Sequence, residues 1–85
     1  MAYTVIIGNK AQKEYFRVPP PHDKALKKAI DTLESEPRPQ GVKKLAGTRE
    51  GYRVRVGPYR ILYTIDDRHR IVTIYRIRHR REAYR

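Results

Sequence analysis

The sequence predicts an α+β fold, in which a small antiparallel β-sheet of about four strands carries an N-terminal α-helical hairpin on one face. Residues 51–63 alternate apolar and basic side chains, which is the period of a strand with one buried and one exposed face. Residues 21–35 instead repeat apolar side chains at helical spacing, at Leu26, Ala29, Ile30 and Leu33. Because the chain has 85 residues, we expect one domain that spans residues 1–85.

The N-terminal half predicts one strand and two helices. Residues 3–7 are mostly β-branched and indicate the first strand. A first helix is expected from Asn9, as its N-cap, to about Val18, where three consecutive prolines end it. The second helix follows directly and runs to about residue 35. A connection this short predicts that the two helices lie antiparallel.

The C-terminal half supplies the remaining strands after a linking loop at residues 40–50. Gly57 and Pro58 separate two alternating segments and predict a two-residue hairpin turn. This turn sets a register that pairs Val54 with Ile61 and Arg55 with Arg60. A polar turn at residues 66–69 precedes the last strand, residues 70–78, and the order of elements is β-α-α-β-β-β. Residues 79–85 are expected to form a short helix or an extended end.

Charge is the strongest global feature of the sequence. Lysine and arginine number 20 against 9 acidic residues, which gives a net charge of +11. Residues 1–50 carry seven lysines, three arginines and six acids, whereas residues 51–85 carry ten arginines, no lysine and three acids. Arginine grips phosphate through two donors and stacks on bases. The pattern therefore favours a nucleic-acid partner over a surface that merely aids solubility.

Several other classes of protein receive no support. The chain has no cysteine, and its three histidines are isolated in sequence, so we expect neither a metal nor a cofactor. Asp66 and Asp67 are interpreted as turn residues. No apolar run reaches the length of a membrane span and no leader is evident, so we expect a cytoplasmic protein without membrane contact.

One face of the predicted hairpin concentrates arginine. Arg55 lies opposite Arg60, with Arg53 beside them, although like charges placed opposite each other destabilise a sheet. We interpret this face as a surface that meets a polyanion. Fixed guanidinium groups stabilise the charge that develops on phosphate when a 2′-OH attacks it, so RNA cleavage is one chemistry open to such a face.

The runs KKLAGTREGYRVRVGPYRILYTID and IVTIYRIRHRREAYR resemble the RelE toxin family, part of the RelE/ParE superfamily of toxin–antitoxin systems. The resemblance implies a metal-independent endoribonuclease that cuts mRNA in the ribosomal A site. It also implies a small acidic antitoxin as partner, together with the ribosome and mRNA. Well-studied family members have lysines where this chain has Arg53 and Arg55, so the charge is kept but proton transfer by this pair is disfavoured.

The resemblance also assigns site residues. It implies catalytic roles for Arg60, Arg80 and Tyr84. RNA binding is assigned to Arg53, Arg55, Arg81, Lys43 and Lys44. Two alternatives remain open from the sequence: a ParE-like inhibitor of DNA gyrase, and an RNA-binding module without catalysis.

Overall fold

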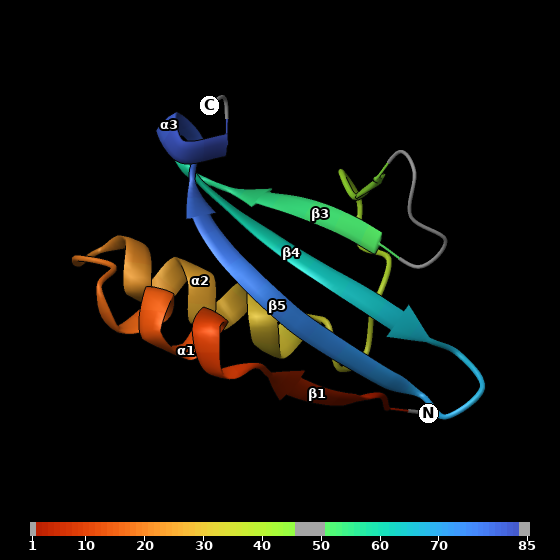
Figure 1. Cartoon of the computed structure of the whole chain (residues 1–85). Coiled ribbons are helices and arrows are strands. Elements are labelled where there is room, and N and C mark those ends of the chain that lie inside the picture. The colour runs from red at the N-terminus through yellow and green to blue at the C-terminus, as the bar shows by residue number, and fades with distance from the viewer. Residues whose placement is uncertain (1, 46–50, 84–85) are drawn as a thin grey trace.

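The computed structural model describes residues 2–45 and 51–83, and it places two helices against one face of a five-stranded sheet (Figure 1). The elements are β1 (Thr4–Ile7), α1 (Asn9–Phe16), α2 (His22–Thr32), β2 (Lys43–Lys44), β3 (Gly51–Val56), β4 (Tyr59–Asp66), β5 (Ile71–His79) and α3 (Arg80–Ala83). The strands lie in the order β1-β5-β4-β3-β2. The predicted α+β class and the predicted helical hairpin are confirmed.

The sheet differs from the prediction in two respects. It is mixed, because β1 runs parallel to β5, with Thr4 beside Ile71 and Ile7 beside Ile74. It also gains β2, which pairs with β3 inside the segment expected to be only a loop. A parallel pairing between distant segments leaves no local signal in the sequence, and a two-residue strand is too short to show a period.

The core lies between the helices and the sheet. Leu26 and Leu33 are fully buried and Ile30 is nearly so, which confirms the predicted helical stripe. Ile61, Tyr63, Val72 and Ile74 cover the facing side of the sheet and are likewise fully buried. The hydroxyl of Tyr63 donates to the carbonyl of Pro37 at 2.8 Å. Burial raises the pKa of Tyr63 to about 12, so this donor stays protonated at neutral pH.

The start of α1 differs from the predicted cap. Gly8, rather than Asn9, is the N-cap residue, and no side chain caps this helix. The amide of Gly8 donates to the carbonyl of Ile74 at 2.9 Å, and a Cβ at Gly8 would lie only 3.3 Å from that oxygen. Glycine thus permits the close approach of the helix start to β5. The side-chain amide of Gln12 donates to the backbone carbonyl of Ile7 at 2.8 Å.

The β3–β4 hairpin has the predicted register. Val54 pairs with Ile61 and Arg55 with Arg60, and the turn contains only Gly57 and Pro58. Gly57 has a φ of 58°, a conformation that glycine adopts without steric cost. Because side chains alternate along a strand, this register decides which residues share a face.

A polar network ties the far end of the sheet to the segment after α2. Arg38 donates to both carboxylate oxygens of Asp67, at 3.2 and 2.8 Å, and Tyr3 donates to Asp67 at 2.6 Å. Arg38 also lies over the ring of Tyr52, 5.2 Å from its centroid. Hydrogen bonds from Arg38 and then Tyr3 lower the pKa of Asp67 to about 2.

The lowered pKa of Asp67 predicts an acid-dependent contribution to stability. The contribution is present above the unfolded-state value near 3.9 and is lost as the pH falls towards 2. Urea unfolding should show that Asp67→Asn is less stable than the wild type at pH 7, with the difference shrinking between pH 4 and pH 2. A difference that stays constant over this range would contradict the assignment. Asp31→Asn, which removes an exposed pair with Lys27, should cost less than about 0.5 kcal/mol at pH 7.

Candidate nucleic-acid interface

Three arginines lie side by side on the face of the sheet that is turned away from the helices. Ile61 and Tyr63 on β4 point to the core. Arg60 directly precedes Ile61, and side chains alternate along a strand, so Arg60 points to the opposite face. Arg60 pairs with Arg55 on β3 and with Arg78 on β5. We call Arg55, Arg60 and Arg78 the arginine row. Both cross-strand neighbours of Arg60 are therefore cations. The neighbour on β3, Arg55, is the one that the predicted hairpin register placed there.

The members of the arginine row differ in exposure. Arg60 is only 7% exposed, Arg78 is half-buried and Arg55 is exposed. A long side chain that is almost wholly buried has few conformations, so the Arg60 guanidinium is held in place before any ligand arrives. This arrangement suits a group that must meet a phosphate in one defined geometry.

A pocket of about 150 Å³ opens at the turn end of the row, and none of the described residues that line it is acidic. It is lined by Arg55, Gly57, Pro58, Tyr59, Arg60 and Arg80. Arg80 comes from α3, whose first backbone N–H donates to the carbonyl of Pro58 at 2.8 Å. The chain end thus brings Arg80 to the hairpin. Three arginines line one small pocket, which makes it a candidate site for an anion.

Aromatic contacts hold this end of the hairpin against the rest of the fold. The ring of Tyr59 meets the ring of His79 edge-on at 5.2 Å and lies 5.6 Å from His22 at the start of α2. His79 also accepts a hydrogen bond from the backbone N–H of Arg81 at 3.2 Å. These contacts fix the wall of the pocket that Tyr59 provides.

A bulge in β5 explains why Arg78 joins the row. The pairing between β4 and β5 shifts between Leu62 and Tyr63, and Ile77 is buried whereas strict alternation from Ile74 would bury Arg76. The Glu14 carboxylate on α1 accepts from the Arg76 guanidinium at 3.0 and 2.9 Å and from the Ile77 N–H at 2.8 Å. Burial alone would raise the pKa of Glu14, but these hydrogen bonds outweigh it and hold the pKa below its usual value.

The remaining predicted residues divide between the two faces. Lys43 pairs with Arg53, so both extend the basic surface from Arg55 toward β2. Lys44, which was also assigned to RNA binding, pairs with Tyr52, whose ring stacks on Tyr63, and so lies on the other face of the sheet. Arg81 is exposed on α3, beside Arg80. Tyr84 lies outside the described residues.

Arg78 is the residue that the sequence-based assignment missed. It was placed correctly on the last strand, but its face depends on the bulge at β5. The sequence holds one usable signal. Residues 75–78 read Tyr-Arg-Ile-Arg, and strict alternation after Ile74 would place Arg76 rather than Ile77 in the core. A bulge of one residue in this strand brings Ile77 to the core instead.

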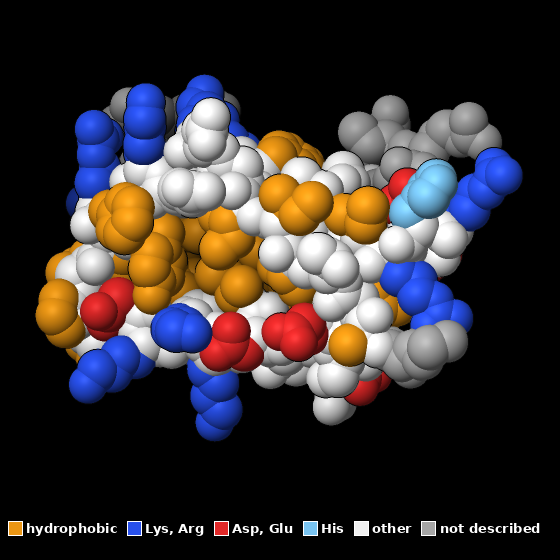
Figure 2. All heavy atoms as spheres, turned by 90° about the horizontal axis from the view of Figure 1, so that it is seen from below, with side chains coloured by type: hydrophobic (Ala, Val, Ile, Leu, Met, Phe, Trp, Pro, Cys, Tyr) orange, Lys and Arg blue, Asp and Glu red, His pale blue; other side chains and the backbone are white. Residues whose placement is uncertain are grey.

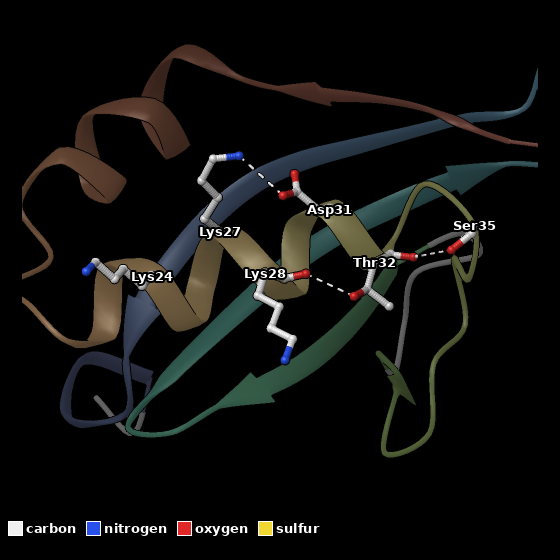
Figure 3. A pocket seen from close by; sticks show the side chains of 6 residues that line it. All are labelled: Lys24, Lys27, Lys28, Asp31, Thr32 and Ser35. Carbon is white, nitrogen blue, oxygen red and sulfur yellow. Dashed lines mark hydrogen bonds and ion pairs between the residues drawn. The ribbon is translucent and has the colours of Figure 1, made fainter.

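A second, more open hollow of about 510 Å³ lies along α2 and is not a candidate site (Figure 3). Several of its polar side chains bond to each other or to the helix backbone: Lys27 pairs with Asp31 at 3.2 Å, and Thr32 donates to the carbonyl of Lys28 at 2.9 Å. Figure 3 shows these side chains spread along the helix rather than pointing to one centre. A solvated helix face explains this arrangement.

Metal ligation and membrane insertion find no support in the described ranges. Within residues 2–45 and 51–83, no three His, Asp or Glu side chains gather into a set that could hold a metal ion. In the same ranges, no helix has the length and apolar character needed to cross a membrane.

The chain matches known toxins over nearly its whole length. Residues 5–84 match the model of the ParE toxin of type II toxin–antitoxin systems. The toxin RelG of Mycobacterium tuberculosis is 38% identical over 89 residues, which cover 100% of this chain and 99% of RelG.

Solved toxin–antitoxin complexes share the fold. The RelE–RelB complex of Pyrococcus horikoshii contains a chain with a TM-score of 0.84 and 32% identity, covering 94% of this chain and 97% of that one. The RelBE2 complex of Mycobacterium tuberculosis contains a chain with a TM-score of 0.82 and 32% identity, and the match covers 93% of this chain and 99% of that one.

If the arginine row binds a nucleic-acid backbone, we expect Arg78 to contribute to the affinity, although Arg78 does not line the pocket. Arg78→Leu should weaken binding of a single-stranded oligonucleotide and reduce the slope of log affinity against log salt by about 0.7, the value for one lost phosphate contact. Fluorescence anisotropy over a salt series measures both quantities. Lys24→Leu, on α2 across the sheet, is the control and should leave the slope unchanged. An unchanged slope for Arg78→Leu would remove Arg78 from the interface.

Proposed function

The chain belongs to the RelE/ParE family, the toxins of type II toxin–antitoxin systems, and from this premise we propose that it is a RelE-type endoribonuclease. It cuts mRNA in the ribosomal A site, stops translation and growth, and is neutralised by a small acidic antitoxin. The ribosome and mRNA place its action in the cytoplasm. The observation that carries the proposal is the pocket at the hairpin turn, which Arg55, Arg60 and Arg80 line together.

The proposed reaction needs little covalent help from the protein. The 2′-oxygen of one nucleotide attacks the adjacent phosphorus, the bond to the 5′-oxygen breaks, and the proton of the 2′-OH ends on that leaving oxygen. The products are a 2′,3′-cyclic phosphate and a 5′-OH. Negative charge builds on the phosphate oxygens in the transition state, and fixed guanidinium groups stabilise it by roughly 3–4 kcal/mol for each well-placed donor.

Each site residue has a distinct proposed role. Arg60 and Arg80 face the scissile phosphate from the pocket, and Arg78 and Arg55 hold its neighbours along the row. Arg53, Lys43 and Arg81 bind the backbone on either side of the pocket, and Tyr84 orients or stacks a nucleotide. Arginine is not deprotonated near neutral pH, so this set acts by orienting RNA and by electrostatics rather than as a general base. No step of this mechanism requires a metal.

Substitution of Arg60 tests the proposal. Arg60→Ala should slow cleavage of ribosome-bound mRNA by about 100- to 1000-fold, the effect of removing one charge-stabilising donor. Primer extension on stalled ribosomes measures the cleavage. Because Arg60 is buried, Arg80→Ala serves as a second variant with an exposed side chain, and it should slow cleavage in the same direction.

Lys24→Ala is the control for lost positive charge and should cleave like the wild type. If both arginine variants, folded as judged by circular dichroism, give the wild-type cleavage pattern, the assignment of the pocket is wrong. If the wild-type protein binds ribosomes but cuts nothing, it is an RNA-binding module without catalysis.

One observation favours a second function. The matching family model carries the name of ParE, and a ParE-like inhibitor of DNA gyrase is the alternative proposal. Parallel assays of gyrase supercoiling and of protein synthesis in a cell extract separate the two. We expect synthesis to stop at protein concentrations that leave supercoiling intact, and the reverse result would favour the gyrase inhibitor.

A further inference from the structure

Arg80 reaches the pocket at the hairpin turn from α3, a helix of a single turn. A helix as short as Arg80–Ala83 is not stable by itself, so it depends on contacts with its surroundings. One such contact is the hydrogen bond from the backbone N–H of Arg80 to the carbonyl of Pro58, at 2.8 Å. Because the Arg80 side chain is exposed, its place in the pocket depends on how firmly α3 is held.

The pocket draws a third of its arginines from α3. Figure 2 shows acidic and basic side chains mixed around an apolar patch on the face seen from below. In the described lining of the pocket, by contrast, the charged side chains are Arg55 of β3, Arg60 of β4 and Arg80 of α3. The hairpin register holds the first two opposite each other. Arg80 is therefore the member of this set whose position needs a separate explanation.

His79 caps α3 at its start. It directly precedes the helix, and its Nδ1 atom accepts a hydrogen bond from the backbone N–H of Arg81 at 3.2 Å. The first N–H groups of a helix have no acceptor within the helix, and an N-cap side chain supplies one to the second or third residue. Nδ1 accepts only when it carries no proton, so the neutral ring holds its proton on Nε2.

The ring of His79 is itself held by the sheet. Tyr59 is its cross-strand partner on β4, and the two rings meet edge-on with 5.2 Å between centroids. The Tyr59 ring in turn lies 5.6 Å from the ring of His22, at the start of α2. Aromatic pairs in this geometry attract each other beyond the apolar area they bury. The acceptor that caps α3 is thus attached to a fixed part of the fold.

His79 does not reach the anion pocket with its side chain. Ile77 is buried on the helical side of the sheet, and His79, two residues later, lies on that same side. There it lines a separate pocket of about 170 Å³ with Glu14, Arg17 and Tyr59. His79 is not one of the described residues that line the pocket at the hairpin turn. Any effect of His79 on a bound phosphate therefore passes through α3.

We propose that His79 is a positioning residue, which caps α3 through Nδ1 and thereby holds the Arg80 guanidinium at the scissile phosphate. The proposal rests on the proposed function, in which Arg80 stabilises the charge on that phosphate. His79 neither gives nor takes a proton in the reaction. An acceptor of another kind that reaches the Arg81 N–H can replace it, whereas an aromatic ring without an acceptor cannot.

Two substitutions separate the acceptor from the ring. His79→Asn removes the ring but keeps an acceptor, and asparagine is a favoured N-cap residue. His79→Phe keeps a ring against Tyr59 but has no acceptor. His79→Phe should lower kcat/KM for cleavage of ribosome-bound mRNA by about 5- to 30-fold, the range that loss of a helix cap corresponds to, mainly through kcat. His79→Asn should stay within about twofold of the wild type.

A double-mutant cycle shows whether His79 acts through Arg80. When it is combined with Arg80→Ala, His79→Phe should change the cleavage rate by less than about twofold, because the side chain that the cap positions is absent. The same cycle is measured on binding of a single-stranded oligonucleotide by fluorescence anisotropy, which follows the contact of Arg80 without cleavage.

His69→Ala is the matched control. His69 is also a histidine whose Nδ1 has a polar partner, the Asp66 carboxylate at 2.8 Å. It lies in the turn between β4 and β5, at the other end of the sheet from α3 (Figure 1). Its replacement should leave kcat and KM within about twofold of the wild type. Circular dichroism confirms that each variant is folded.

Three results would overturn the proposal. A loss in His79→Asn as large as in His79→Phe would show that the imidazole itself is needed. A loss in His79→Asn with none in His79→Phe would assign His79 to packing against Tyr59. Equal effects of His79→Phe with and without Arg80→Ala would show that it acts independently of Arg80.

Failure of the proposed function is a separate result. If the wild type cuts no mRNA, the nuclease assignment is wrong, and the anisotropy cycle decides the role of His79. An effect of His79→Phe on oligonucleotide affinity that disappears in combination with Arg80→Ala then supports the positioning role. An effect that persists in that combination overturns it.

Discussion

The Glu14 carboxylate is the contact on which the functional face depends. It reaches from α1 to β5, where it accepts from both the Arg76 guanidinium and the Ile77 N–H beside the bulge. The bulge changes which face the end of β5 presents, so Ile77 enters the core and Arg78 joins Arg55 and Arg60. By pairing with Arg76, the same carboxylate neutralises one cation close to the row. A helix from the packing side thus determines which arginines the opposite side displays.

The sheet tolerates adjacent like charges because its two faces have different roles. Apolar burial against α1 and α2, centred on Leu26, Leu33 and Tyr63, stabilises the fold on one face. The arginine row on the other face places like charges beside one another, an arrangement that by itself disfavours a sheet and that fits the proposed role of this face in binding an anion. A bound polyanion relieves that repulsion, and a ligand that binds only the folded state also stabilises it. Binding and stability are therefore coupled through the row.

Local patterns predicted the parts of the structure that short-range geometry determines. The Gly57-Pro58 turn and strict alternation were enough to place Arg55 opposite Arg60, and the apolar stripe gave α2 its buried face. The parallel pairing of β1, the two-residue strand β2 and the true N-cap at Gly8 depend on partners distant in sequence. Arg78 was missed for a related reason, since the bulge that turns it outward is held by Glu14, 62 residues before Arg76. The separation of Lys43 and Lys44 onto opposite faces depends on the register of β2, which has no sequence signal.

We propose that the pocket at the hairpin turn, with Arg60 and Arg80 at the scissile phosphate, promotes attack by a 2′-OH on the adjacent phosphate of ribosome-bound mRNA. The most direct measurement uses two otherwise identical mRNAs, one of them carrying a single 2′-deoxynucleotide at the position cut in the A site. We expect that the all-ribose message is cut to a 2′,3′-cyclic phosphate and a 5′-OH, and that the substituted message stays intact at that position while still binding. Equal cleavage of both messages, or cleavage of neither, would contradict it.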